Sequence, residues 1–139
     1  MARIRLDLPE QFSFSTKIAI RITDVNYGGH VGNDTILTLI HEARVQFLKH
    51  FGYQELNVEG ASLIMSDAAI EFKNELFYGD TIIAFVTANN FSRVGFDLVY
   101  KLTRDDTSIA HAKTGMICYD YNLKKVISLP DTAKEKLFV

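Results

Sequence analysis

The feature that most constrains the fold is one stretch of helical periodicity in a chain whose other patterned segments are typical of strands. Between Asn33 and Phe51, apolar residues recur at intervals of three and four, which predicts an amphipathic helix about 28 Å long at ~1.5 Å per residue. Asn33 or Asp34 can cap its first turn, and Gly52 suits the position after its last turn. The apolar stripe consists of Ile36, Leu39, Ile40, Ala43, Phe47 and Phe51, widened by Leu37 and Leu48.

The segments on both sides of this helix have the pattern of strands. Residues 17–24 alternate, with three isoleucines on one face. Turn-forming sequences such as "NNFS" and "RDDTS" between the later segments favour antiparallel hairpins. A sheet with a single helix to cover it wraps around that helix, so the predicted class is α+β, with five antiparallel strands around one central helix. The later strands are expected at 62–72, 81–88, 94–102 and 109–121, and residues 131–138 form a short helix or a tail.

Length and composition narrow the function classes. The 139 residues contain no repeat or linker, so we expect a single domain over 1–139. With 15 basic and 17 acidic residues and a net charge of −2, a nucleic-acid partner is not expected. Cys118 is the only cysteine, which fits a reducing compartment. No apolar run or signal-like start suggests a membrane segment or secretion, so we expect a cytoplasmic protein.

Residues 25–34, "VNYGGHVGND", place glycines and polar side chains between the first strand and the helix. Continuing the strand alternation puts Asp24, and further along Asn26, on the interior side. Helix N-termini carry unpaired N–H groups, so the amides from Val31 to Asn33 can form an oxyanion hole, and the glycines let backbone approach a substrate closely. The alternative is a tight turn from strand to helix with no chemical role.

These segments resemble the hotdog-fold thioesterases, in particular the group that includes hydroxybenzoyl-CoA thioesterase and small bacterial acyl-CoA thioesterases. The resemblance rests on "R-x-x-D-x-N-x-x-G-H-V-x-N" (21–33) and "HEARVQFLKHFGY" (41–53), followed in order by "AAIEFKNELFYGD" (68–80), "SRVGFDLVY" (92–100) and "VISLP" (126–130). It implies a hotdog fold and hydrolysis of an acyl thioester at a dimer interface, with no metal and no tightly bound cofactor. The thioester would be carried by CoA or by an acyl carrier protein.

The sequence departs from the usual pattern of this family at two positions. The family reads D-x-D-x-x-G-H-V-N-N, and its second aspartate attacks the thioester or activates water. That position is Asn26 here, and Gly32 replaces the first asparagine of the usual pair. The resemblance therefore implies a catalytic loop whose usual carboxylate is absent.

Several residues can take the place of the missing base. An imidazole can act as a general base, so His30, together with Asp24, is the first candidate. Asp34 is the next candidate, although a carboxylate in the first helical turn is stabilised as an anion and is a weaker base. Asn26 is expected to position water or the carbonyl. The backbone of Gly29, Val31, Gly32 and Asn33 is expected to bind the substrate.

Two acidic residues outside the loop are weaker candidates. Glu42 lies mid-helix, where related hotdog enzymes place a catalytic carboxylate. Asp67 interrupts the apolar strand "LIMSDAAI". By alternation it shares a face with Glu71, so it points to solvent or to another subunit, and from there it can reach a partner's loop as a substrate-binding group. The histidines lack metal-ligand spacing, so no metal site is expected, and Cys118 is expected in the core.

An open sheet leaves edges that a soluble protein must protect, so a homodimer or homotetramer is expected. Two other functions stay open. A hotdog enoyl hydratase has an Asp and a His in a related pattern, although Tyr27 stands here where the hydratase pattern has proline. A domain that binds acyl-CoA without cleaving it would also explain the loss of the carboxylate at position 26.

Overall fold

The helix that dominates the sequence pattern is also the axis of the structure. The computed structural model describes residues 2–138. Helix α1 (Asn33–His50) follows Gly32, whose carbonyl accepts bonds from the amides of Thr35 (3.0 Å) and Ile36 (3.2 Å). The prediction that Asn33 or Asp34 caps the helix is therefore wrong, because the N-cap is Gly32. The C-terminal prediction is confirmed, since Gly52 has φ +84° and donates to the Lys49 carbonyl (2.9 Å).

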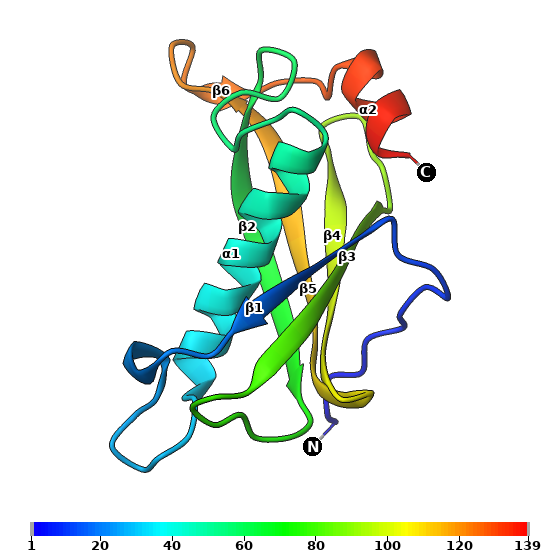
Figure 1. Cartoon of the computed structure of the whole chain (residues 1–139). Coiled ribbons are helices and arrows are strands. Elements are labelled where there is room, and N and C mark those ends of the chain that lie inside the picture. The colour runs from blue at the N-terminus through cyan, green and yellow to red at the C-terminus, as the bar shows by residue number, and fades with distance from the viewer. Residues whose placement is uncertain (1, 139) are drawn as a thin grey trace.

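Antiparallel strands curve around α1 (Figure 1). Their order in the sheet is β1-β3-β4-β5-β2, so β1 and β2 are the two edges of this path. A short strand, β6, pairs with β5, so the sheet has six strands where five were expected. The strands are β1 (Phe14–Ala19), β2 (Ser62–Phe72), β3 (Thr81–Asn89), β4 (Gly95–Arg104), β5 (Thr107–Asp120) and β6 (Lys125–Val126).

The first strand is shorter than its alternation predicts. β1 ends at Ala19, and a single 3₁₀ turn, η1 (Ile22–Asp24), follows it. Ile22 is consequently 65% exposed, so the expectation that it continues the buried face is wrong. Asp24 is buried as expected, but the turn places it there, since the strand has already ended.

A bulge in β2 changes which side chains face the helix. The pairing with β5 shifts by one residue between Met65 and Asp67. Ile64 pairs with Ile117 and therefore faces away from α1, although strict alternation along residues 62–72 predicts that it shares a face with Ala68, Ile70 and Phe72. Those three residues lie opposite buried positions of β5, on the side that faces α1.

The core lies between α1 and the concave side of the sheet. Phe47 is fully buried and its ring lies 4.9 Å from that of Phe51 and 6.0 Å from that of Phe14. Arg44 is also buried, although its side chain is charged. Leu37 is 37% exposed, so it does not widen the buried stripe as expected. The buried residues of α1 are Ile36, Leu39, Ile40, Ala43, Arg44, Phe47 and Leu48.

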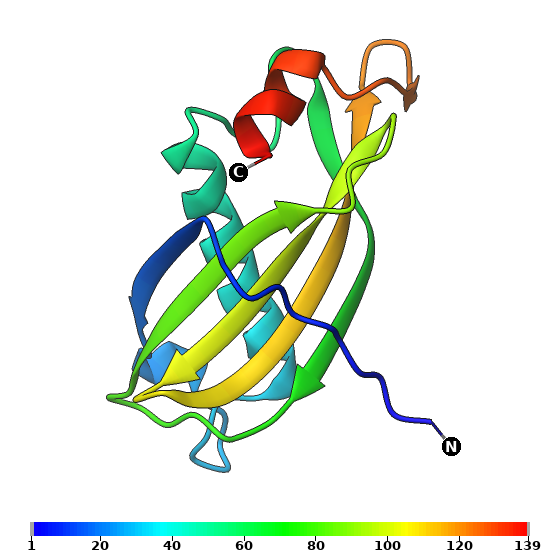
Figure 2. The same cartoon turned by 90° about the vertical axis from the view of Figure 1, so that its right-hand side faces the viewer.

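The N-terminal segment and the C-terminal helix both pack against the rest of the fold. Figure 2 shows the N-terminal segment crossing the convex side of the sheet. Its contacts include a bond from the Leu6 amide to Glu71 (2.7 Å) and ring packing of Phe12 on Phe85 at 5.8 Å. Residues 131–138 were expected as a helix or a tail, and Asp131–Leu137 form helix α2. None of the described helices is long and apolar enough to cross a lipid bilayer.

Candidate functional site

The loop between η1 and α1 is closed by its own backbone and by the side chain of Asn26. The Asn26 amide donates to the His30 carbonyl (3.0 Å), and the Gly29 amide donates to the Asn26 carbonyl (3.0 Å). The side-chain oxygen of Asn26 accepts a bond from the Gly28 amide (2.9 Å). Gly29 has φ +87°, a backbone conformation that favours glycine. These hydrogen bonds close the turn and orient the Asn26 side chain.

Two of the predicted site residues, Asn26 and Asp34, lie next to a third, Gly32. A Cβ atom built on Gly32 would lie 2.6 Å from Oδ1 of Asp34 and 3.5 Å from Nδ2 of Asn26. Both side chains thus occupy the space next to the backbone of Gly32. Asn26 and Asp34 are exposed, so water and a substrate can reach them.

His30 belongs to the same turn and is partly buried. Its Nδ1 lies 3.2 Å from the Val31 carbonyl oxygen. When Nδ1 carries the proton it donates to this oxygen, and Nε2 keeps its lone pair as a base or an acceptor. A Cβ atom built on Gly28 would lie 3.6 Å from Nε2 of His30 and 3.1 Å from Oδ1 of Asn26, so the imidazole lies beside the Asn26 side chain.

The backbone amides of the predicted oxyanion hole differ in what they bind. The Val31 amide donates to the Leu76 carbonyl (2.9 Å), so it is engaged in holding the loop to the segment before β3. Gly32 and Asn33 form the N-terminus of α1, where the first amides have no intrahelical acceptor. These two amides are the ones placed to receive a negative oxygen, and the helix dipole favours it there.

Asp24 is the last residue of η1, just before the loop, and is 5% exposed. Its carboxylate accepts a bond from the Arg21 amide (2.8 Å) and pairs with the Arg21 guanidinium at 3.4 Å. Both interactions stay within η1 and its preceding residue. Asp24 therefore stabilises the 3₁₀ turn.

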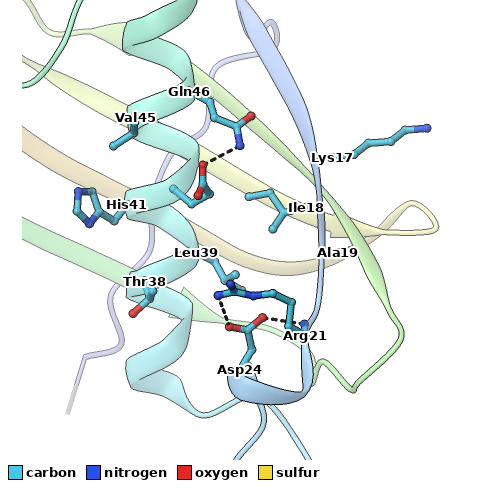
Figure 3. A pocket seen from close by; sticks show the side chains of 11 residues that line it. Lys17, Ile18, Ala19, Arg21, Asp24, Thr38, Leu39, His41, Val45 and Gln46 are labelled. Atoms are coloured by element: carbon cyan, nitrogen blue, oxygen red, sulfur yellow. Dashed lines mark hydrogen bonds and ion pairs between the residues drawn. The ribbon is translucent and has the colours of Figure 1, made fainter.

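A groove of about 450 Å³ runs between α1 and β1 and reaches Asp24 (Figure 3). Ile18 and Leu39 supply apolar surface within it, and Arg21 and Asp24 lie at one end. Glu42 also lines the groove, and its carboxylate accepts a bond from Gln46 (2.8 Å). The complete lining is Lys17, Ile18, Ala19, Arg21, Asp24, Thr38, Leu39, His41, Glu42, Val45 and Gln46.

Sequence reasoning did not single out Thr38 or His41 as groove residues. A signal for Thr38 was present, because Asp34, Thr38 and Glu42 are four residues apart and so share one face of α1. The direction of that face relative to β1 depends on the packing of the helix on the sheet, which the local pattern does not specify.

Asp67 does not join this group within one chain. It lies at the β2 bulge and accepts bonds from Lys113 (2.7 Å) and from the Gly115 amide (3.0 Å). The bond from Lys113 holds the pKa of Asp67 below its ordinary value. Lys113 faces away from α1, since its neighbours Ala112 and Thr114 are buried beneath the helix, so Asp67 lies on the convex side of the sheet.

The remaining candidate groups are not arranged for chemistry. Cys118 is fully buried, and burial raises the pKa of its thiol to about 11, so it is not a thiolate near neutral pH. Within residues 2–138, no three His, Cys, Asp or Glu side chains form a cluster that could hold a metal ion. Arg44 ties the helix to the sheet and to a loop, with Nη1 3.5 Å from the Tyr100 hydroxyl and Nε 3.7 Å from Glu55.

Comparisons with known proteins agree with this architecture. The family model described as "Thioesterase-like superfamily" matches residues 20–137. A 1,4-dihydroxy-2-naphthoyl-CoA hydrolase from Microcystis aeruginosa is 31% identical over 124 residues, which cover 85% of this chain and 88% of that protein.

Solved structures of similar shape include thioesterases. A 1,4-dihydroxy-2-naphthoyl-CoA thioesterase from Synechocystis has a TM-score of 0.81 at 21% identity, covering 90% of this chain and 95% of its own. A gentisyl-coenzyme A thioesterase has a TM-score of 0.79 at 17% identity, covering 89% and 99%. At these identities the likeness concerns the fold, and it confirms the predicted α+β hotdog architecture.

Proposed function

Since this chain belongs to the thioesterase-like superfamily and is a thioester hydrolase, we propose that its substrate is an acyl-CoA, cleaved to the free acid and CoA. In this reaction the oxygen of water bonds to the thioester carbon and the C–S bond breaks. CoA leaves as a thiolate and takes up the proton that the water released. The reaction needs donors for the carbonyl oxygen and an acceptor for that proton.

The observation that carries the proposal is that Asn26 and Asp34 lie beside Gly32 at the start of α1, with His30 next to Asn26. The amides of Gly32 and Asn33 bind the carbonyl oxygen as it becomes negative. Asn26 and Asp34 lie beside that point and His30 lies next to Asn26, and in this proposal these groups hold water and accept its proton. Asp24 keeps η1 in place, while Gly29 and Val31 shape the loop against the substrate.

The groove between α1 and β1 supports a bulky acyl group. Its volume of about 450 Å³ is in the range of small-molecule sites, and it combines apolar surface from Ile18 and Leu39 with polar groups from Thr38 and His41. The relative from Microcystis aeruginosa is named for a hydroxylated aromatic acyl-CoA. We therefore propose an aromatic acyl-CoA as the first substrate class, with CoA rather than an acyl carrier protein as the carrier.

A second copy of the chain completes the site in this proposal. β2 is an edge strand, and on its concave side Met65 and Phe72 are 45% and 49% exposed. Pairing of two copies along β2 covers this apolar surface and gives a dimer, and two dimers give the tetramer. Asp67 at the β2 bulge then contributes to the site across the contact.

The proposed setting of the enzyme is the cytoplasm, without a nucleic-acid or membrane partner. The chain has 15 basic and 17 acidic residues, so it has no excess of basic residues for a polyanionic partner. The single cysteine is buried, so it is not available for an intermolecular disulfide.

Thiol release from a panel of short, medium, long and aromatic acyl-CoAs tests the proposed function. We expect cleavage of at least one member, with aromatic acyl groups cleaved fastest. Cys118→Ala is the control, and it should release thiol as the wild type does because the buried thiol takes no part. Tight binding of acyl-CoA without any thiol release would show a binding domain, and loss of the conjugated absorbance of crotonyl-CoA would show a hydratase.

A further inference from the structure

Gly32 matters because of the space that its missing side chain leaves. Its backbone, at φ −73° and ψ 159°, is open to any residue, so no backbone strain requires glycine there. A Cβ atom would nevertheless meet Oδ1 of Asp34 at 2.6 Å, closer than real Cβ contacts. The glycine therefore lets the Asp34 carboxylate fold back over the start of the helix, towards Asn26.

Asn26 presents one end of its amide to the same space. Its Oδ1 is occupied by the Gly28 amide at 2.9 Å, which directs Nδ2 towards Gly32, at 3.5 Å from the Cβ position. A carboxylate oxygen and an amide donor thus flank one point beside the amides of Gly32 and Asn33. This arrangement provides an acceptor for a proton and donors for an oxygen within one small space.

Three other carboxylates already accept hydrogen bonds from protein groups. Asp24 is bound by the Arg21 amide and guanidinium, and Glu42 by Gln46. Asp80 binds Arg104 at 2.9 Å and the Phe77 amide at 2.9 Å. No hydrogen bond joins the Asp34 carboxylate to another part of residues 2–138, and the residue is exposed. Of the two aspartates within residues 24–34, Asp34 is thus the one whose oxygens are available to water.

We propose that Asp34 is the catalytic carboxylate of this enzyme and that Gly32 is the residue that makes room for it. This inference rests on the proposed function. The carboxylate takes a proton from the attacking water, whose oxygen bonds to the thioester carbon, and the C–S bond then breaks to release the CoA thiolate, which receives that proton. Asn26 donates from Nδ2 to the water or to the substrate oxygen. The charge supplied by position 34 thereby compensates for the amide at position 26.

Steady-state kinetics on the acyl-CoA that the wild type cleaves fastest test this role. Asp34→Asn keeps the size of the side chain and removes its charge, so we expect kcat to fall about 100-fold or more, with KM and Tm nearly unchanged. Asp131→Asn is the matched control, because Asp131 is also exposed in the first turn of a helix, α2. It should keep the wild-type kcat.

The double variant Asn26→Asp/Asp34→Asn returns a carboxylate to the other side of the same space. We expect its kcat to be about tenfold or more above that of Asp34→Asn, because a general base contributes at least this much. If Asp34→Asn keeps at least half of the wild-type kcat, the role of Asp34 is overturned while the proposed function stands. If the wild type cleaves no member of the panel, the proposed function fails and this role fails with it.

Discussion

Asp24 precedes a loop that Asp34 follows, and the two carboxylates have opposite surroundings. Asp24 is buried and its carboxylate is bound by the amide and guanidinium of Arg21. Asp34 is exposed and lies over Gly32, beside the Asn26 amide. Two carboxylates in one polar stretch can therefore have different roles, because the hydrogen bonds that each already makes determine what it can still do. The first maintains a turn, and the second can accept a proton.

The largest effect expected from this contrast concerns the stability that Asp24 provides. Asp24→Ala removes the acceptor for the Arg21 amide and should lower the free energy of unfolding by about 2 kcal/mol, as for hydrogen bonds to charged groups. Urea denaturation measures this loss. Arg21→Ala, which removes only the 73% exposed guanidinium, should cost about 0.5 kcal/mol or less. If Asp24→Ala kept full stability but lost turnover, the contrast between the two aspartates would be wrong.

Gly32→Ala tests the other side of the comparison and should have an intermediate effect. The new Cβ displaces Oδ1 of Asp34, so we expect kcat to fall about tenfold, because displacing a reacting group by ~1 Å has effects of this order or larger. Tm should change little, since the backbone of Gly32 suits alanine.

Gly60→Ala is the control for this substitution. Gly60 has φ +93° and nothing within 4 Å of its Cβ position. The variant should lose about 1 kcal/mol of stability through backbone strain and keep its turnover. An unchanged kcat in Gly32→Ala would show that the space over this residue is not used in catalysis.

The smallest effect is expected for a third aspartate, Asp67, which is itself exposed to solvent. The Lys113 hydrogen bond lowers the pKa of Asp67 in the folded chain, so the pair stabilises the fold fully above the unfolded value of about 3.9. This stabilisation is lost as the pH falls below that value and the carboxylate is protonated. Its size is small because the Asp67 side chain is 60% exposed.

Melting temperatures of the wild type and Asp67→Asn between pH 7 and pH 3 measure this contribution. The difference between the two proteins should shrink towards pH 3. A difference that stays constant over this range would show that the charge of Asp67 does not stabilise the fold, and would place its role elsewhere.

Sequence patterns predicted the fold well where the type of a residue matches its burial or its backbone conformation. The stripe from Ile36 to Phe47 predicted the buried face of α1, and Gly52 predicted the end of the helix. The patterns failed where an element ended early or shifted by one residue. η1 replaced the last part of the first strand, and the bulge between Met65 and Asp67 reversed the side chains of β2. Neither change is visible in the residue types of its segment, so the periodicity of those residues does not predict it.

The candidate site was predicted as a loop, but the roles within it were not. The sequence identified residues 24–34 as the place where polar groups and a helix N-terminus meet. It did not show that the Val31 amide is used by Leu76, nor that the carboxylate of Asp24 is occupied. Hydrogen bonds of this kind depend on distances in space between segments or on local turn geometry, which the order of residues does not report.

By itself, the sequence determined that one helix must be wrapped by strands, because its only long helical pattern has an apolar side that a sheet has to cover. It also determined that a glycine-rich polar loop precedes that helix. Only the tertiary structure decided which carboxylate is available, because availability depends on the donors that folding brings to each oxygen. It likewise decided that Gly32 leaves room for Asp34, since this is a matter of atoms competing for the same space.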